Sequence, residues 1–314
     1  MAIGIGIDVA SEKVDVGSSD GKLLAVYERN DSDLARLVQD LKGLDICRVV
    51  LEASGGYEQL VLTTLFAAGL PVVLVDARRA RDFAKGTGRK AKTDKIDAKM
   101  LADMAVIGVD DVALWRPLES DLAELHDLVH RRTSLVVALH SETMRRRDAA
   151  SSVAASLARG IAFLKGEIAE MERAINKIVR RSDRIRKATE ALEGVKGVGR
   201  ILATTLLTTV PELGTLGRNQ IAALVGVAPM NVDSGKGSKR RFIQGGRAAT
   251  RKALYMGALS GIRHNEHLRA YYTRLRERQV KGKVALVACM RKLLIHLNAL
   301  MRVHLSQQEL QAAS

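Results

Sequence analysis

The spacing of apolar residues changes once along the chain, and this change limits the folds that the chain can adopt. Up to about residue 107, apolar stretches typical of strands come first in succession and then alternate with stretches typical of helices. From Asp121 onward, apolar residues recur at helical spacing. This order predicts an α/β domain with a mixed sheet, followed by a mainly α-helical part.

The first half divides into short predicted elements. We expect strands at residues 2–9, 13–16, 22–28, 48–51 and 71–75, and helices at residues 32–41, 57–68 and 93–107. The first three strands are joined by short turns and therefore predict an antiparallel meander. Ser32 or Asp33 is a plausible cap for the first helix, and Thr93 for the third.

The region from Asp121 to about Leu192 predicts a long helical hairpin with its tip near residues 148–152. The pattern fits two helices that pack within one monomer, and it fits a coiled-coil arm that dimerises. A further compact, mainly helical region begins at Glu193. We therefore expect three parts, at residues 1–115, 116–190 and 191–314.

Charge is divided unequally between the two halves. The chain of 314 residues carries a net charge of +15, but residues 1–110 hold 15 basic and 17 acidic residues. Residues 233–302 hold 17 basic residues against three acidic ones. Such a field attracts phosphate backbones, so nucleic acid is the expected partner. Aromatic residues make up only 3%, which disfavours base-stacking recognition platforms.

Cysteine spacing, the length of apolar stretches and the N-terminal sequence indicate where in the cell the protein acts. The two cysteines, Cys47 and Cys289, are far apart and form neither a metal-ligand spacing nor a disulfide framework. No stretch approaches the roughly 20 uninterrupted apolar residues of a membrane span, and the N-terminus does not resemble a secretory signal. We expect a cytoplasmic protein with no membrane partner.

Four acidic residues occupy positions where an α/β enzyme gathers its site. Asp8 ends the first predicted strand, and Glu52 ends a later one. Carboxylates at strand ends meet at one edge of a mixed sheet. Asp94 and Asp97 are three residues apart at the start of a predicted helix, so they share one helix face.

Acidic side chains that converge repel one another, and bound cations offset this repulsion. All-oxygen donors suit Mg²⁺ or Mn²⁺, and two such ions about 4 Å apart would activate a nucleophile and stabilise a leaving oxygen at one phosphate. A simpler interpretation makes each acid an ordinary turn, cap or helix-start residue. Nearby lysines could also neutralise the two aspartates of the helix: Lys90, Lys92, Lys95 and Lys99.

The second half contains two segments suited to phosphate. Between two predicted helices, Lys196, Gly197 and Gly199 form a tight turn whose backbone N–H groups could approach a phosphate, as in a helix-hairpin-helix element. A simple helix-to-helix turn is the alternative.

The other segment, residues 231–241, is polar, rich in glycine and basic. Gly235 would leave the hydroxyl of Ser234 exposed in a tight turn. From residue chemistry alone, an ordinary turn serine is favoured over a nucleophile, because a serine nucleophile needs a base or metal for activation. The neighbouring cations could neutralise a phosphate under attack: Lys236, Lys239, Arg240 and Arg241.

The ordered set of these motifs resembles the DEDD transposases of the IS-110 insertion-sequence family, over nearly the whole chain. In the first half, the resemblance rests on residues 5–9, 52–55 and 92–98, and in the second half on residues 195–199, 226–235, 245–247 and 253–256. Each piece alone is weak, but their order and spacing together are specific.

The resemblance implies an RNase H-like (RuvC-like) domain whose metal-binding tetrad is Asp8, Glu52, Asp94 and Asp97. It implies a helical linker and a C-terminal transposase domain in which Ser234 becomes linked to a DNA phosphate, with Ser238 nearby as an alternative. It also implies homo-oligomers with composite sites, and a structured guide RNA that pairs with donor and target DNA. The basic residues of the second half, including Arg247, would contact these nucleic acids.

Three other functions remain open. A structure-selective nuclease such as a junction resolvase would use the same acids and metals, with water as the nucleophile. An actin-like ATPase or sugar kinase also begins with a glycine-rich strand that ends in Asp, but the chain lacks a second phosphate loop of that kind. A non-catalytic binder would use only the basic half.

Overall fold

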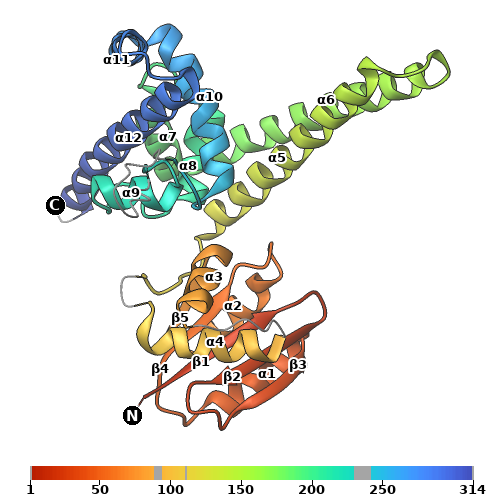
Figure 1. Ribbon diagram of the computed structural model, residues 1–314, viewed down its shortest axis with the longest axis vertical. Helices are drawn as coiled ribbons and strands as arrows, with labels where there is room; N and C mark the ends of the chain where they lie inside the picture. The colour runs from red at the N-terminus through yellow and green to blue at the C-terminus, as the bar shows by residue number, and fades with distance from the viewer. Residues whose placement is uncertain (1, 88–93, 110–111, 230–241, 313–314) are drawn as a thin grey trace. The chain divides into compact units, whose positions relative to one another are not determined.

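The computed structural model describes residues 2–87, 94–109, 112–229 and 242–312, and at residues 94–96 and 311–312 it describes only the backbone. The chain divides into two compact units, Met1–Pro117 and Leu118–Ser314, each with its own hydrophobic core (Figure 1). We call them unit 1 and unit 2. The three-part division at residues 115 and 190 stays a prediction.

Unit 1 contains a five-stranded mixed sheet. The strands are β1 (Ile3–Val9), β2 (Lys13–Ser18), β3 (Leu24–Glu28), β4 (Ile46–Glu52) and β5 (Val72–Val75), in the order β3-β2-β1-β4-β5. The β1–β2 and β2–β3 pairs are antiparallel, and the β1–β4 and β4–β5 pairs are parallel. The predicted α/β fold with a meander and a mixed sheet is confirmed.

Helices cover both faces of this sheet, because alternate strand residues are apolar on both faces. On one face, α1 (Asp31–Leu41) and α2 (Glu58–Ala67) bury Ile5, Ile7 and Leu51. On the other face, α3 (Ala77–Gly86) and α4 (Asp94–Ile107) form a second cluster with Val50, Val73 and Val75.

Two helix starts differ from the sequence prediction. Asn30, rather than Ser32 or Asp33, caps α1, because its side chain accepts a hydrogen bond from the Asp33 amide at 2.9 Å. The helix α3 was not predicted at all. It is capped by Asp76, whose side chain accepts from the amides of Arg78 and Arg79. Thr93, the cap expected for α4, lies outside the described residues.

Unit 2 begins with a helical arm formed by α5 (Ser120–Arg147) and α6 (Ser151–Arg181) (Figure 1). The predicted helical hairpin is therefore present. Its buried residues concentrate near one end, where Leu125 and Val129 pack with Ile175 and Ile178. Ion pairs also join the two helices, among them Arg132–Glu172 at 2.6 Å.

The rest of unit 2 is helical and surrounds one core. Its helices are α7 (Asp183–Glu193), α8 (Arg200–Thr209), α9 (Arg218–Val225), α10 (Ala248–His264), α11 (Glu266–Glu277) and α12 (Gly282–Ala312). The helix α12 is long and apolar enough to cross a membrane by length and composition alone. Half of that apolar window is buried inside the protein, as in the core helix of a folded domain.

Candidate active site

Asp8 and Glu52 lie at the carboxyl ends of two adjacent parallel strands. In the β1–β4 ladder Ile7 is opposite Leu51, so Asp8 and Glu52 are the next residue on each strand. Ile7 and Leu51 are fully buried in the core beneath α1 and α2. Because successive strand residues point to opposite faces, both carboxylates belong to the face that α4 covers. Both are half-buried.

The helix α4 lies directly on the backbone of this face because β1 and β2 present glycines to it. A Cβ at Gly4 would meet the Ala102 carbonyl oxygen at 2.3 Å, and a Cβ at Gly6 would meet the Ala98 carbonyl oxygen at 2.1 Å. From Gly4 to Gly6 the strand therefore runs toward the beginning of α4. Asp8 is the next residue on this face, so the first turn of α4 lies toward Asp8.

This alignment brings Asp97 toward the same edge as the two strand-end acids. Asp97 is half-buried, one residue before Ala98. Asp94 begins α4, but its side chain lies outside the described residues. Within the described side chains, no group of three or more His, Cys, Asp or Glu residues forms a metal-binding arrangement. The tetrad of Asp8, Glu52, Asp94 and Asp97 thus stays a prediction, with its members on one sheet edge and one helix end.

The loop after Glu52 is fixed by a buried carboxylate that the sequence analysis missed. Glu58 accepts hydrogen bonds from the Ser54 amide at 3.0 Å, the Ser54 hydroxyl at 2.9 Å and the Gly56 amide at 2.9 Å. Burial alone would raise the pKa of Glu58, but these hydrogen bonds outweigh it and lower the pKa below its ordinary value. The ionised Glu58 therefore fixes the turn that follows Glu52.

A second missed acid, Asp15, lies next to Asp8. It is directly opposite Asp8 in the β1–β2 ladder, and only 3% of it is exposed. Its carboxylate forms an ion pair with Lys13 at 3.0 Å. Like charges that face each other across a ladder are destabilising, so the Lys13 partner offsets part of the repulsion at this edge. The sequence did contain a signal for Asp15, because an acidic residue on the face of a predicted strand that points into the protein is unusual.

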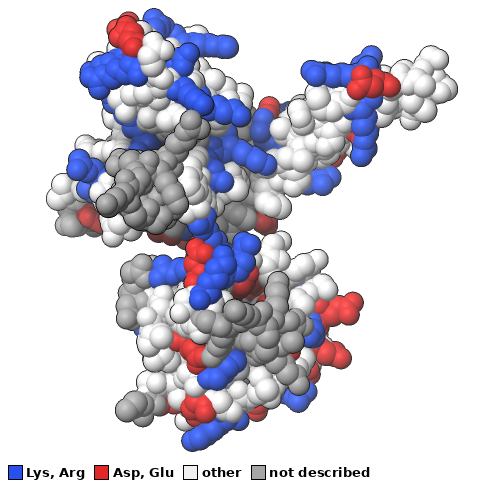
Figure 2. Space-filling model, viewed as in Figure 1, with Lys and Arg blue, Asp and Glu red and all other residues white. Residues whose placement is uncertain are grey.

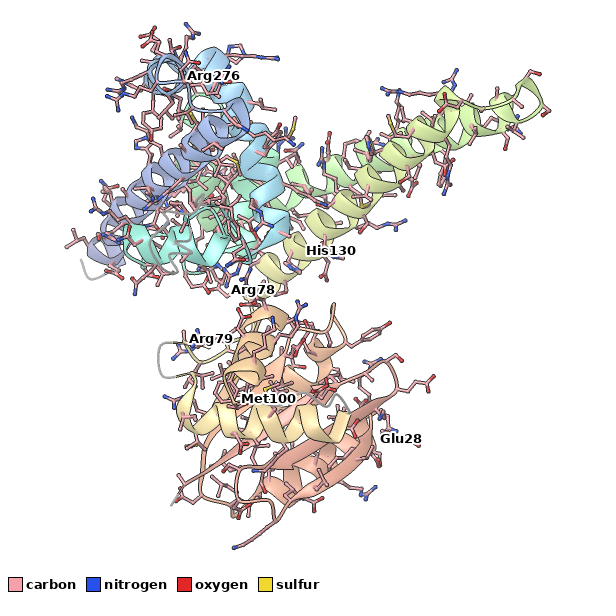
Figure 3. The ribbon with its side chains drawn as sticks, in the orientation of Figure 1. Glu28, Arg78, Arg79, Met100, His130 and Arg276 are labelled. Atoms are coloured by element: carbon pink, nitrogen blue, oxygen red, sulfur yellow. The ribbon has the colours of Figure 1, made fainter. Side chains whose placement is uncertain are left out.

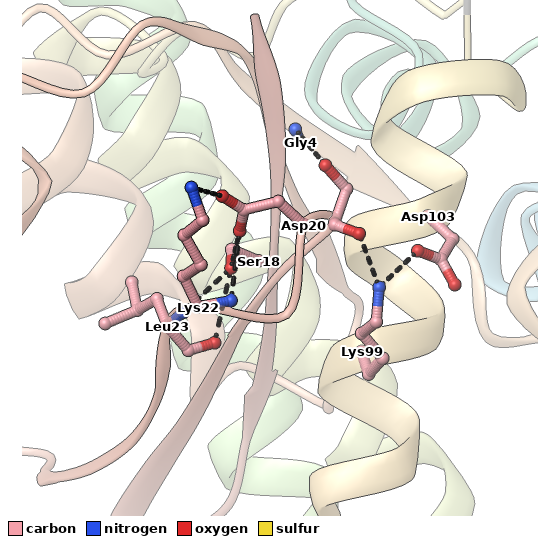
Figure 4. A network of polar contacts seen from close by, with 8 residues as sticks. Gly4, Ser18, Asp20, Lys22, Leu23, Lys99 and Asp103 are labelled. Carbon is pink, nitrogen blue, oxygen red and sulfur yellow. Dashed lines mark hydrogen bonds and ion pairs between the residues drawn. The ribbon is translucent and has the colours of Figure 1, made fainter.

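Lys99 ties α4 to the turn between β2 and β3 (Figure 4). Its ammonium group donates to the Ser19 carbonyl oxygen at 2.7 Å and pairs with Asp103 at 2.8 Å. The amide of Ser19 donates to the Gly4 carbonyl oxygen, and the Gly4 amide donates to the Ser19 hydroxyl. Lys99 thus has structural partners of its own, and the idea that it only neutralises Asp94 and Asp97 loses support.

We expect Lys99→Met to destabilise unit 1 by about 1–2 kcal/mol, because one charge-assisted contact and the pairing of Asp103 are lost together. Urea unfolding followed by circular dichroism measures this effect. Lys22→Met is the matched control, since the Lys22 ammonium is exposed and lies 3.8 Å from Asp20. Equal midpoints for the two variants would contradict the structural role of Lys99.

In unit 2, the turn that contains Lys196, Gly197 and Gly199 joins α7 to α8, as predicted for a helix-hairpin-helix element. Lys196 and Gly199 are exposed. Gly197 has a φ of +102°, and a Cβ there would meet the Gly261 Cα of α10 at 2.5 Å. Glycine is therefore required at residue 197 because the turn packs closely against α10 of the same unit.

Arg247 has an intramolecular partner. Its guanidinium forms two hydrogen bonds with Glu212, at 2.5 and 2.6 Å. Burial alone would raise the pKa of Glu212, but the contact with Arg247 outweighs it and lowers this pKa. The contact fixes the start of α10, so a role for Arg247 in nucleic-acid binding stays a prediction that competes with a structural one.

The remaining predicted site residues of the second half lie outside the described residues. They are the candidate nucleophiles Ser234 and Ser238 and four basic residues, Lys236, Lys239, Arg240 and Arg241.

Two family models match the chain. One, described as a DEDD transposase of the IS110 type, matches residues 5–155, and the other, described as transposase IS116/IS110/IS902 family, matches residues 189–273. These matches define an enzyme of the transposase class that acts on DNA.

Two curated relatives carry the same description, pilin gene-inverting protein, one from Moraxella lacunata and one from Moraxella bovis. Each is 22% identical over 250 residues, which cover 78% of this chain and 77% of the relative. The chain belongs to the IS110 family of transposases.

Solved structures of RuvC from Thermus thermophilus are also similar to part of the chain. One, in complex with a Holliday junction substrate, covers 37% of this chain and all of its own, with 16% identity and a TM-score of 0.28. Another covers 36% and 99%, with 16% identity and a TM-score of 0.26. The sheet order and the helices of the chain itself confirm the predicted α/β N-terminal domain with a mixed sheet and the mainly helical C-terminal part.

Proposed function

We propose that this transposase cleaves and rejoins DNA strands with divalent metal held at the carboxylate edge of unit 1 and with a serine nucleophile from unit 2. The observation that carries the proposal is the placement of Asp8 and Glu52 at the ends of adjacent parallel strands, on the face that bears the start of α4. Independent turn or cap residues have no reason to share one edge and one face.

The chemistry of these donors fits Mg²⁺ or Mn²⁺. Asp8, Glu52 and Asp97 offer only carboxylate oxygens, and no histidine or cysteine of the described residues joins them in a metal-binding group. Such an ion supplies positive charge that polarises a phosphate and lowers the pKa of an attacking hydroxyl. The carboxylates would hold it, while the Lys99 contact would maintain the position of α4 relative to β1.

The covalent step that we propose belongs to Ser234. Its hydroxyl oxygen forms a bond to the scissile phosphorus and releases its proton to solvent, while the bond from phosphorus to one DNA oxygen breaks and that oxygen leaves as a hydroxyl after protonation. Rejoining reverses this exchange with a hydroxyl from another strand. The bond energy of the phosphodiester is thereby conserved in the protein–DNA linkage, and no external energy source is required.

The proposed partners follow from charge and family. Donor and target DNA are the substrates, a structured RNA is the guide, and a homo-oligomer completes the site. The relatives are named for gene inversion, a rearrangement that requires both cutting and rejoining. The expected place of action is the cytoplasm, where the element's DNA is accessible.

Ser234→Ala distinguishes this function from a nuclease that uses water. We expect the variant to lose strand joining and the covalent protein–DNA adduct, with residual cleavage reduced by at least about a hundredfold. Denaturing gel electrophoresis of the full chain with labelled DNA and the element's RNA, in Mg²⁺, reports both products. Ser238→Ala is the control, and loss of the adduct only in that variant would transfer the role to Ser238. Undiminished cleavage in both variants would favour the water-dependent nuclease.

A further inference from the structure

The helix α3 is far more basic than the unit that contains it. In ten residues, Ala77–Gly86, it has four basic residues and one acidic residue, whereas residues 1–110 as a whole have slightly more acids than bases. We propose that the outward face of α3, formed by Arg78, Arg81 and Lys85, binds the phosphate backbone of the DNA that enters the carboxylate edge. The inference rests on the proposed function of that edge.

The inner side of α3 is fixed by packing, which determines the direction of its outward face. Ala80 is fully buried, and Phe83 packs in the cluster that contains Met104 of α4. The Arg79 guanidinium donates to the carbonyl oxygen of Gly108 at 2.8 Å. Arg79 therefore links α3 to the residue that follows α4, and the other three basic residues lie on a different face of α3.

Arg78, Arg81 and Lys85 follow the spacing of a single helix stripe. Positions i, i+3 and i+7 lie on one face, and the stripe extends over about 10 Å of helix. The side chain of Lys85 is 79% exposed and that of Arg78 35% exposed, and Arg81 is exposed as well. Figure 2 shows Lys and Arg side chains, with acidic side chains beside them, in the region of this helix.

The only acid on α3 does not block this face. Asp82 lies 3.2 Å from Arg78 and 3.9 Å from Lys85, and all three groups are accessible to solvent. Exposed ion pairs of this kind contribute little free energy, so phosphate oxygens can replace Asp82 as partners. The stripe keeps a net positive charge even with Asp82 counted.

The location of α3 connects this stripe to the candidate site. In the β4–β5 ladder Glu52 is opposite Val75, the last residue of β5. Asp76 follows Val75 and caps α3, so Arg78 is only three residues beyond the strand position that faces Glu52. Figure 3 shows Arg78 and Arg79 on α3. If a DNA strand placed one phosphate at the carboxylates, its neighbouring phosphates would lie close to α3.

The chemistry of the stripe favours duplex DNA as its partner. It has guanidinium and ammonium groups but no aromatic side chain, so it offers phosphate contacts without a surface for stacking unpaired bases. The family's substrate is DNA.

Lysine acetylation of the wild-type protein tests the proposal without any substitution. Lys85 and Lys22 are comparably exposed, at 79% and 86%, and Lys22 lies in the β2–β3 turn away from α3. With a mixed-sequence DNA duplex in excess and a chelator present, we expect the acetylation rate of Lys85 to fall at least about threefold while that of Lys22 stays unchanged. Equal rates for Lys85 with and without duplex would overturn the proposal, and so would protection by structured RNA but not by duplex DNA.

A charge-matched pair of variants provides the second measurement. Arg78→Gln/Arg81→Gln/Lys85→Gln should reduce the slope of log Kd against log salt by about two to three, whereas Lys22→Gln/Arg36→Gln/Lys42→Gln should leave it nearly unchanged. Equal slope changes in the two triple variants would also overturn the proposal. Both measurements are made in chelator, so they do not depend on metal at the carboxylates. Failure of the proposed function would appear separately, as cleavage that survives Asp8→Asn.

Discussion

We expect Asp8→Asn to reduce DNA strand cleavage by at least about a thousandfold, which corresponds to about 4 kcal/mol in the reaction barrier. Asparagine keeps the size of the side chain but removes its charge, and the neutral amide is a poor ligand for a hard divalent cation. The same substitution should leave duplex binding intact, because the phosphate contacts come from basic residues elsewhere in the chain. Gel-based cleavage in Mg²⁺ and equilibrium binding in chelator measure the two properties separately.

Asp31→Asn is a suitable control, because Asp31 is exposed at the start of α1 on the opposite side of the sheet. It should retain cleavage close to the wild-type rate. If Asp8→Asn cleaves as fast as this control, or if the wild-type protein cleaves at full rate in excess chelator, the metal site proposed at Asp8 and Glu52 is wrong. Urea unfolding of Asp8→Asn that matches the wild type would show that the loss of cleavage does not come from misfolding of unit 1.

The second large effect is structural. We expect Gly6→Ala to destabilise unit 1 by about 3 kcal/mol or more, because the new Cβ would lie 2.1 Å from the Ala98 carbonyl oxygen and 2.2 Å from the Ala102 amide nitrogen. Backbone atoms cannot rotate away, so α4 would have to move off β1. That movement would displace Asp97 from the edge that holds Asp8, and cleavage should fall together with stability.

Urea unfolding of the full chain measures this loss, with Gly86→Ala as the control. Gly86 ends α3, and among the described residues no atom outside its own helix and chain neighbours lies within 4 Å of an added Cβ, so alanine there should be neutral or slightly stabilising. Similar unfolding midpoints for Gly6→Ala and the wild type would show that α4 does not rest on the backbone of β1.

The positions of Asp8 and Glu52 at strand ends could be predicted because they depend on local sequence patterns, whereas their role as metal ligands stays a prediction. Asp8 and Glu52 each end a short apolar stretch, and period-two alternation places them on a definite face once the strands are known. The helix α3 was missed for a different reason. Four basic residues interrupt its short apolar stripe of Ala77, Ala80, Phe83 and Ala84, so the helical spacing is hard to recognise. Asp76 in front of them is nevertheless a recognisable helix cap.

Pairings between distant segments could not be predicted in the same way. The partners of Lys99 include the Ser19 carbonyl, which is 80 residues away, and Arg247 binds Glu212 across 35 residues. Asp15 faces Asp8 only because the β1–β2 register places them opposite each other. A one-residue shift of that register would put Asp15 on the other face of the sheet, and the sequence pattern alone does not fix the register this closely.

The arm formed by α5 and α6 is unevenly stabilised along its length. Its buried residues are most numerous where it meets the rest of unit 2, with Leu125, Val129, Ile175 and Ile178, whereas toward the tip Leu135 and Ile161 are the buried apolar side chains among the described residues. The free energy needed for local opening therefore decreases with distance from that base. We therefore expect the tip of the arm to unwind and re-form more often than its base.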